Sequence, residues 1–273
     1  MRVVELSDHP GALLRQERQD SAAATGRGQA QYEEALARHR QRAGRARRAR
    51  DQARAERRWW AWLRGIAAVW GERRRVPVPP HRAVAPSDQE EILKAGIEGE
   101  RLAVAEFGRA LDAQWTLFRG YRNRGGEIDH LLLGPGGLVA IEGKHRNATV
   151  DCDGDQWWFT KYDRYGNPRE RDKFTDRRGR SPSEQLNQPA DLLEDFLRSR
   201  GHSVAIRRVV LFTHPRSRLG NCTNPTVHIT TSTGQVIKLI NTAPAAITAT
   251  ERAALERLIT RDHNYHQNRR PPR

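Results

Sequence analysis

Two carboxylates and a lysine near the middle of the chain have the types and spacing of a hydrolytic site. Asp129 lies in a strand-like apolar run, residues 128–133, and Glu142 and Lys144 directly follow a second run, residues 138–141. Two acids in an apolar setting repel each other, and a hard divalent cation with oxygen ligands removes that conflict. A lysine beside such a cation could orient or help to deprotonate an attacking water and offset charge on a phosphate.

A tight turn at residues 135–136 would join the two runs into a hairpin. In that register paired positions add up to 271, so Asp129 is expected directly opposite Glu142, and Glu127 opposite Lys144. Opposed residues on antiparallel strands point to one face of the sheet, and so do residues two apart. Two alternatives stay open. A three-residue loop would shift the register and separate the carboxylates, and the charged residues could form a salt-bridge cluster on a half-exposed sheet.

The elements that must position these residues indicate one α/β domain over residues 89–260. A capping box at residues 87–90 begins a helix with apolar positions from Leu93 to Leu111, and the aromatic stretch around Trp157 and Trp158 indicates a further hairpin. The remaining expected elements are a helix over 181–197, a buried strand over 204–212, shorter strands over 227–230 and 236–240, and a helix from Thr248 to about Ile259.

Outside this domain the chain is poor in core-forming residues. Residues 1–88 are expected to form a basic, mostly helical or partly disordered arm, with a weakly structured lead-in over 1–28 and a helix over 31–70. A proline-rich break at 76–80 ends that helix and forms a stiff linker. Residues 261–273 are expected to be a disordered basic tail.

Charge favours a polyanionic partner. The formal net charge is +15 and the pI is about 10.9, which favours nucleic acid first and an anionic membrane surface second. The alternative is a basic solvated surface with no ligand. Only two cysteines occur, Cys152 and Cys222, and the N-terminus has no apolar signal region, so a cytoplasmic location is expected.

The segment Trp59–Trp70 carries an apolar stripe flanked by arginines. It is too short to span a bilayer and contains Arg64. Three interpretations are open: it docks on the following domain or on a protein partner, it lies in a membrane interface, or it contacts nucleic acid.

Four sequence blocks in order give the chain a family resemblance. They are Gly96-Ile97-Glu98-Gly99-Glu100, Glu127-Ile128-Asp129-His130, Gly137 to Lys144 ending in Glu142-Gly143-Lys144, and Ser181-Pro182-Ser183-Glu184-Gln185. Together they resemble the NERD (nuclease-related domain) family of the PD-(D/E)xK nuclease superfamily. Two departures are Ser181, where asparagine is commoner, and Gly143, where a β-branched residue is more usual.

The resemblance implies a PD-(D/E)xK-type mixed central sheet flanked by helices, here preceded by the basic arm. It implies hydrolysis of nucleic-acid phosphodiester bonds that depends on Mg²⁺ or Mn²⁺, with DNA as the expected substrate. Carried over residue by residue, Asp129 and Glu142 would hold the metal and Lys144 would serve the water and the transition state. Glu100 would be an additional acid, and Gln185 would assist orientation.

Several further residues have competing interpretations. Glu127 is either a metal ligand or a partner of Lys144, and His130 is expected in the core because it alternates with Asp129. The basic segment 161–180 could follow a phosphate backbone or be a solvated loop. For the whole chain, which we expect to be bacterial, the alternative function is a catalytically inactive nucleic-acid-binding or scaffold protein with the nuclease fold.

Overall fold

The computed structural model describes residues 1–79, 88–163, 165–242 and 247–268. The chain divides into two compact units. Unit 1 comprises Met1–Leu13 and Ile92–Arg273, and unit 2 comprises Leu14–Glu91.

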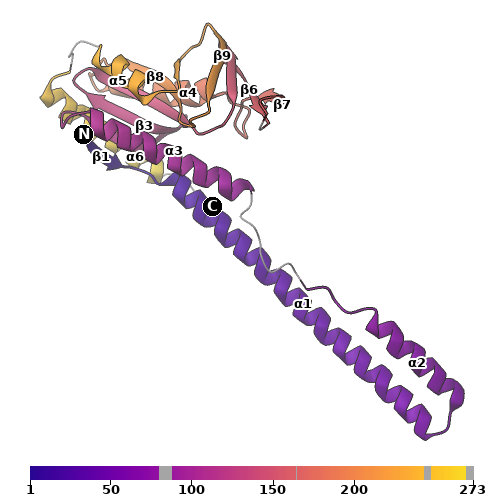
Figure 1. The fold of residues 1–273 in the computed structure, drawn as a ribbon. Coiled ribbons are helices and arrows are strands. Elements are labelled where there is room, and N and C mark those ends of the chain that lie inside the picture. Colours follow the sequence, from indigo (N-terminus) through magenta and orange to yellow (C-terminus); the bar gives the residue numbers. More distant parts are fainter. Residues whose placement is uncertain (80–87, 164, 243–246, 269–273) are drawn as a thin grey trace. The chain divides into compact units, whose positions relative to one another are not determined.

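A six-stranded mixed sheet is the centre of unit 1 (Figure 1). Its strand order is β1-β2-β3-β4-β8-β10. The strands are β1 (Arg2–Glu5), β2 (Thr116–Asn123), β3 (Gly126–Gly134), β4 (Gly137–Lys144), β8 (Ile206–Phe212) and β10 (His228–Thr230). The strand β3 is antiparallel to both of its neighbours, β2 and β4, whereas β8 runs parallel to β4.

Helices cover both faces of this sheet. One face packs against α3 (Asp88–Ala110) and α5 (Thr233–Asn241), through Phe107 and Val236 among others. The other face packs against α4 (Pro182–Ser199) and α6 (Ala249–Asn268). Burial on both faces explains why β3, β4 and β8 read as continuous apolar runs. The expected fold class, a mixed sheet flanked by helices, is therefore confirmed.

A second sheet continues the core on the α4 side. Its order is β7-β6-β5-β9, and the strands are β5 (Thr149–Asp153), β6 (Gln156–Tyr162), β7 (Pro168–Lys173) and β9 (Arg218–Thr223). Trp157 and Phe159 on β6 are buried in the same core cluster as α4. The two cysteines are free thiols and register partners on the adjacent strands β5 and β9.

Unit 2 is a helical hairpin made from most of α1 (His9–Ala55) and from α2 (Trp59–Arg73). The turn between them contains Arg57 with a positive φ of 56°. The helices run antiparallel: Gly65 of α2 lies against Arg50 of α1, and the carbonyl of Glu72 contacts His39 Nε2 at 2.8 Å. Small side chains line the contact, and Ala53 is buried there.

The expectation for the N-terminal region was wrong in two respects. The first residues are not a weak lead-in, because β1 pairs in parallel with β2 and α1 begins at His9. The single helix over 31–70 is instead two helices, since the chain reverses at residues 56–58. The hydrophobic pattern did not indicate β1. Its four residues form the edge strand of the sheet and pair with β2, which is more than a hundred residues away in the sequence.

Two C-terminal expectations were also wrong. Residues 236–240 belong to the helix α5, because Val236 and Ile240, four apart, are both buried on one face. The helix α6 begins as expected, with Thr248 Oγ1 accepting a hydrogen bond from the Glu251 amide, but it continues to Asn268. Of the expected tail, residues 261–268 are therefore helical and 269–273 lie outside the described residues. Ser87, the expected cap of α3, also lies outside them.

Crossing a bilayer would need a longer or more apolar helix than any in the described part of the chain.

We predict that Gly65→Leu detaches α2 from α1. A Cβ at Gly65 would lie 2.8 Å from Arg50 Cβ and 2.9 Å from Arg50 Cα, and the backbone atom cannot move aside cheaply. Amides of α2 should then exchange with deuterium at least tenfold faster than in the wild type. Gly71→Leu is the matched control, because a Cβ there meets no atom within 4 Å. Equal protection in both variants would show that the close contact does not hold the hairpin together.

Candidate active site

The β3–β4 hairpin opens where the charged residues begin. Ladder pairs run from Gly134↔Gly137 to His130↔Ile141, in the expected register, and stop there. The strand β4 continues to pair with β8 as far as Lys144. The expectation that Asp129 and Glu142 are direct ladder partners was therefore wrong. Instead the Gly143 amide donates a hydrogen bond to Asp129 Oδ2 at 2.8 Å.

The same point of β3 is irregular on its other side. Gly120, which would oppose Asp129 on β2, has a φ of +66°, and regular pairs form only on either side of it. A Cβ at Gly120 would clash with the Ser7 carbonyl, so glycine is needed there twice over. Ile128 and Leu131, three residues apart, both reach the same core cluster. Strict alternation along the strand is thus broken at Asp129.

Lys144 links two elements at this opening. Its Nζ donates to Glu142 Oε1 at 2.6 Å and to Gln185 Oε1 at 2.9 Å. Glu142 is only 6% exposed, so this ion pair lies largely away from water. The expected position of Glu127 opposite Lys144 was wrong, because Glu127 faces Arg122 in the ladder with β2 and forms an ion pair with it at 2.7 Å.

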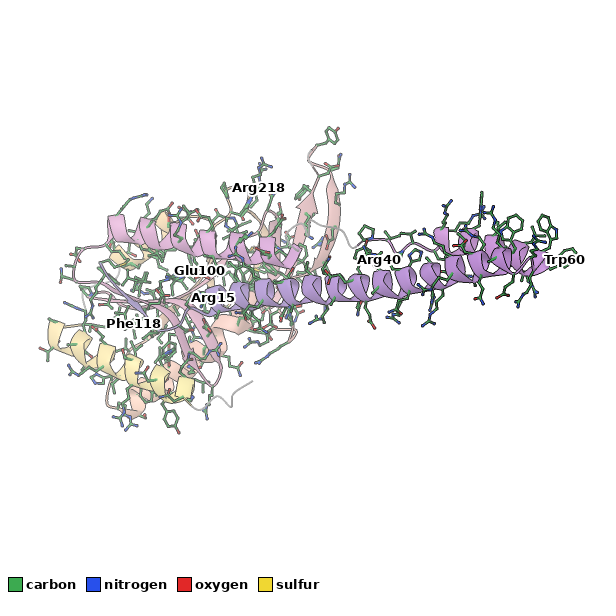
Figure 2. The ribbon with its side chains drawn as sticks, turned by 90° about the horizontal axis from the view of Figure 1, so that it is seen from below. Arg15, Arg40, Trp60, Glu100, Phe118 and Arg218 are labelled. Carbon is green, nitrogen blue, oxygen red and sulfur yellow. The ribbon has the colours of Figure 1, made fainter. Side chains whose placement is uncertain are left out.

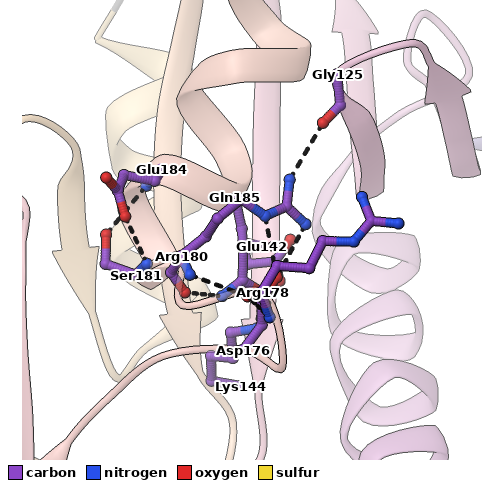
Figure 3. Close-up of polar contacts among 9 residues, drawn as sticks. All are labelled: Gly125, Glu142, Lys144, Asp176, Arg178, Arg180, Ser181, Glu184 and Gln185. Atoms are coloured by element: carbon purple, nitrogen blue, oxygen red, sulfur yellow. Dashed lines mark hydrogen bonds and ion pairs between the residues drawn. The ribbon is translucent and has the colours of Figure 1, made fainter.

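The start of α4 holds Gln185 in place (Figure 3). Ser181 is the N-cap: its Oγ accepts from the Glu184 amide, and its own amide donates to Glu184 Oε2 at 2.7 Å. Gln185 Nε2 donates to the Arg180 carbonyl at 2.9 Å, which leaves Oε1 to accept from Lys144. Serine therefore caps this helix in place of the commoner asparagine, and the capping box positions Gln185.

An acidic residue that sequence reasoning overlooked orders the loop before α4. Asp176 Oδ1 accepts from the amides of Arg178 and Arg180, and Oδ2 accepts from Arg180 Nε at 3.0 Å. Burial opposes the charge on Asp176, but these hydrogen bonds outweigh it and lower its pKa. Arg180 also donates to the Gly125 carbonyl at 3.1 Å (Figure 3). The available signal was an aspartate five residues before a helix cap, within a segment treated only as basic.

A glycine lets α3 approach the sheet beside the site. A Cβ at Gly99 would lie 2.5 Å from Thr213 Oγ1 and 2.7 Å from His145 Nδ1. The next residue, Glu100, accepts a hydrogen bond from Arg119 on β2 at 3.5 Å. Glu98 points elsewhere and pairs with Arg101 at 2.6 Å on the surface. The close approach explains physically why glycine precedes the acid in this block.

Three carboxylates influence one another at this position. Burial raises the pKa of Glu100 to about 7, with Arg119 opposing and Glu127 and Glu142 adding to the rise. Burial also raises the pKa of Asp129 well above its usual range, and the nearby Glu142 and Glu100 raise it further. Arg119 offsets part of the charge on Glu100, and Lys144 is the cation that acts on Glu142 and Asp129.

Lys144 remains charged in this setting. Burial alone would lower its pKa, but the carboxylates of Glu142 and Asp129 outweigh burial and raise it above its ordinary value. A lysine with a raised pKa is an ammonium at neutral pH and has no lone pair with which to accept a proton.

The nearby histidines do not join the carboxylates. His130 is buried, neither ring nitrogen has a hydrogen-bond partner among the described residues, and burial lowers its pKa to about 3. It is a neutral core residue, as its position next to Asp129 in the strand suggested. His145 Nδ1 lies 3.0 Å from Thr213 Oγ1, and its ring contacts that of His214.

The two adjacent tryptophans on β6, Trp157 and Trp158, differ in burial. Trp157 is buried and its Nε1 donates to Ser183 Oγ at 3.0 Å, so it supports the start of α4. Trp158 is half-buried.

The donors at this site fit a hard cation in chemistry. Asp129 and Glu142 offer carboxylate oxygens whose mutual repulsion a divalent ion would relieve. Among the described residues, no group of three or more His, Cys, Asp or Glu side chains is arranged to hold a metal ion. Mg²⁺ commonly binds through one or two carboxylates and completes its shell with water and phosphate, so two acids are sufficient donors.

The mixed sheet with helices on both faces is an α/β architecture of the nuclease type. Residues 95–213, somewhat less than half of the chain, match the model of the NERD family, described as the nuclease-related domain. The match confirms the resemblance seen in the sequence. No curated protein and no solved structure matches the chain.

We predict that Glu100 makes the metal-free protein less stable as pH rises. Its pKa in the folded state is about 7, above the ordinary 4.5, so the folded state binds the proton more tightly. Stability from this group is present below pH 4.5 and is lost as pH rises through 7. Each pKa unit corresponds to about 1.4 kcal/mol. Glu100→Gln should therefore gain up to about 3 kcal/mol over the wild type between pH 5 and 8.

The measurement is urea unfolding in EDTA at several pH values. Glu98→Gln, two residues away on the same helix, is the control, because its hydrogen bond with Arg101 lowers the pKa of Glu98. A difference between wild type and Glu100→Gln that does not change with pH would contradict the assigned environment.

Proposed function

We propose that this protein is a metal-dependent nuclease that hydrolyses nucleic-acid phosphodiester bonds, with DNA as its substrate and little sequence specificity. The observation that carries the proposal is the convergence of Asp129, Glu142 and Lys144 where the hairpin opens, within a nuclease-related domain. A salt bridge that served only stability would not need the half-buried Asp129 in addition to the buried Glu142 beside Lys144.

Asp129 and Glu142 are the proposed ligands of Mg²⁺ or Mn²⁺. Such an ion, when bound, would polarise a phosphate oxygen and lower the pKa of its water. The Gly143 amide, which donates to Asp129 Oδ2, fixes the direction of that carboxylate's second oxygen. Gly143 lies within the strand β4, so it does not act as a flexible point of the chain. A Cβ there would lie 3.6 Å from Asp129 Oδ2.

Lys144 acts through its positive charge. In the metal-free protein its pKa is raised by Glu142 and Asp129, which favours a charged side chain over one that accepts a proton from water. The ammonium lies between Glu142 and Gln185, where it can offset charge that builds up on a phosphate in the transition state. Gln185 is a positioning residue, since its amide joins Lys144 to the Arg180 carbonyl.

Glu100 is the group best suited to accept a proton near neutral pH. A general base works best when its pKa lies near the working pH, and Glu100 has a pKa of about 7. Arg119 holds its carboxylate in place from β2. A cation bound by Asp129 and Glu142 would lower the pKa of Glu100, so the proton affinity of Glu100 depends on whether that cation is bound.

Arginines beside the site fit a nucleic-acid strand. Arg177 and Arg178 are exposed on the loop that Asp176 orders. A cleft of about 760 Å³ at the start of α4 is lined by Arg124 and Arg180 but also by Asp155, Glu184 and Asp191, so it is not a positive groove. The exposed loop arginines are the side chains that would bind phosphates without reading bases.

The test of the proposed function is cleavage of supercoiled plasmid and labelled oligonucleotides of DNA and RNA. We predict cutting with Mg²⁺ or Mn²⁺, none in EDTA, and a loss of at least about 100-fold in Glu142→Ala. Asp195→Ala is the matched control, because Asp195 is an exposed acid on α4 paired with Arg198. Binding without cutting in the wild type would instead favour the alternative, a nucleic-acid-binding or scaffold protein.

A second variant pair separates charge from proton transfer at Lys144. Lys144→Arg keeps a cation that cannot act as a base, whereas Lys144→Met keeps only the length of the side chain. We predict that Lys144→Arg cleaves at least tenfold faster than Lys144→Met, in single-turnover assays with saturating metal. Both variants leave Glu142 differently paired, so thermal melting with metal present accompanies the assay. Two equally inactive, folded variants would contradict a purely electrostatic role.

A further inference from the structure

The helix α2 is apolar on two opposite faces. Its inner face, with Gly65 and Val69, is buried against α1. Trp62 is half-buried beside them and stacks on Trp59 with ring centroids 5.1 Å apart. This inner packing alone accounts for a helical hairpin and leaves the rest of the helix free to be polar.

The outer face is nonetheless apolar along its whole length. Trp60, Leu63, Ala67 and Trp70 follow one another at spacings of three and four residues, which places them on one stripe of the helix. Trp60 is 77% exposed, Trp70 60% and Leu63 40%. Trp60 lies near the turn of the hairpin (Figure 2). We call these four residues the outer stripe.

Positive charge surrounds the outer stripe. Residues 57–75 contain six arginines and one acid, Glu72. Arg64 lies within the stripe's own stretch of helix and is exposed, as are Arg57 and Arg58 at one end and Arg73 at the other. Glu72 is partly buried and its ion pair is with Arg75, so it does little to offset this charge at the stripe.

We propose that the outer stripe binds the surface of an anionic lipid bilayer. Tryptophan is favoured at the level of the lipid headgroups, and arginines close to an anionic surface are attracted to it. The helix lies in the interface rather than across it. Its 15 residues extend about 22 Å, short of the roughly 30 Å of hydrocarbon, and Arg64 interrupts it.

Charge disfavours a second copy of this chain as the occupant. A symmetric pair would bring the outer stripes together and with them the surrounding arginines, which repel. Nucleic acid suits the arginines and could stack on a tryptophan. It would leave the aliphatic part of the stripe, Leu63 and Ala67, facing water or phosphate. A bilayer surface satisfies the aromatic, aliphatic and cationic side chains together.

The test is flotation of the full-length protein with vesicles in a density gradient, in EDTA. Vesicles of phosphatidylcholine with one-third phosphatidylglycerol are compared with phosphatidylcholine alone. We expect the wild type to float with the anionic vesicles, less so at high salt, and Trp60→Ser/Trp70→Ser to lose at least tenfold in bound fraction. Leu63→Ser should weaken binding, whereas Leu102→Ser, on α3 and also 40% exposed, should not.

Two further measurements on the same proteins make the outcome decisive. Circular dichroism must show wild-type helix content in each variant, so that lost flotation is not lost folding. Light scattering and oligonucleotide binding identify other occupants. Wild-type protein that does not float overturns the proposal. So does a double variant that floats like the wild type, or one that loses only self-association or oligonucleotide binding.

Discussion

Repulsion between the carboxylates of the half-buried Asp129 and the buried Glu142 is the constraint on which the site depends. Continuing the β3–β4 ladder one pair further would set Asp129 directly against Glu142 in a dry sheet, which is a costly arrangement. The hairpin opens at that point instead, and the Gly143 amide and the Lys144 ammonium take up part of the negative charge. The remaining charge, visible in the raised pKa values of Asp129 and Glu100, is what makes a cation chemically suitable.

Close backbone contacts hold the acids against this repulsion. Gly120 allows β2 to bend beside Asp129, and Gly99 allows α3 to approach closely enough to bring Glu100 to the sheet. The α4 side is fixed by hydrogen bonds, from Asp176 through Arg180 to Gln185 and then Lys144. Repulsive groups are thus kept together by elements whose own stability comes from the apolar core on either face of the sheet.

The fold class and the hairpin register between residues 130 and 141 could be predicted from sequence, because two apolar runs and the Pro-Gly turn between them specify the hairpin locally. What failed depended on distant contacts. The position of Asp129 relative to Glu142 depends on Gly120, on a different strand, and the partner of Glu127 proved to be Arg122. The short strand β1 took its conformation from the sheet whose edge it forms, not from its own propensity. In α5 the apolar positions Val236 and Ile240 have helical spacing and pack on that sheet.

The net charge of +15 and the acidic site act over different distances. Spread over the surface, the arginines draw a polyanion toward the protein and bind its phosphates with little regard to sequence. Within a few ångströms, however, Asp129, Glu142 and Glu100 would repel the same phosphates, and Lys144 alone cannot reverse that sign. A basic surface around an acidic centre therefore makes physical sense if a cation occupies the centre together with the substrate. A protein that only bound nucleic acid would bind more tightly without the acids, so their presence argues for chemistry at this site.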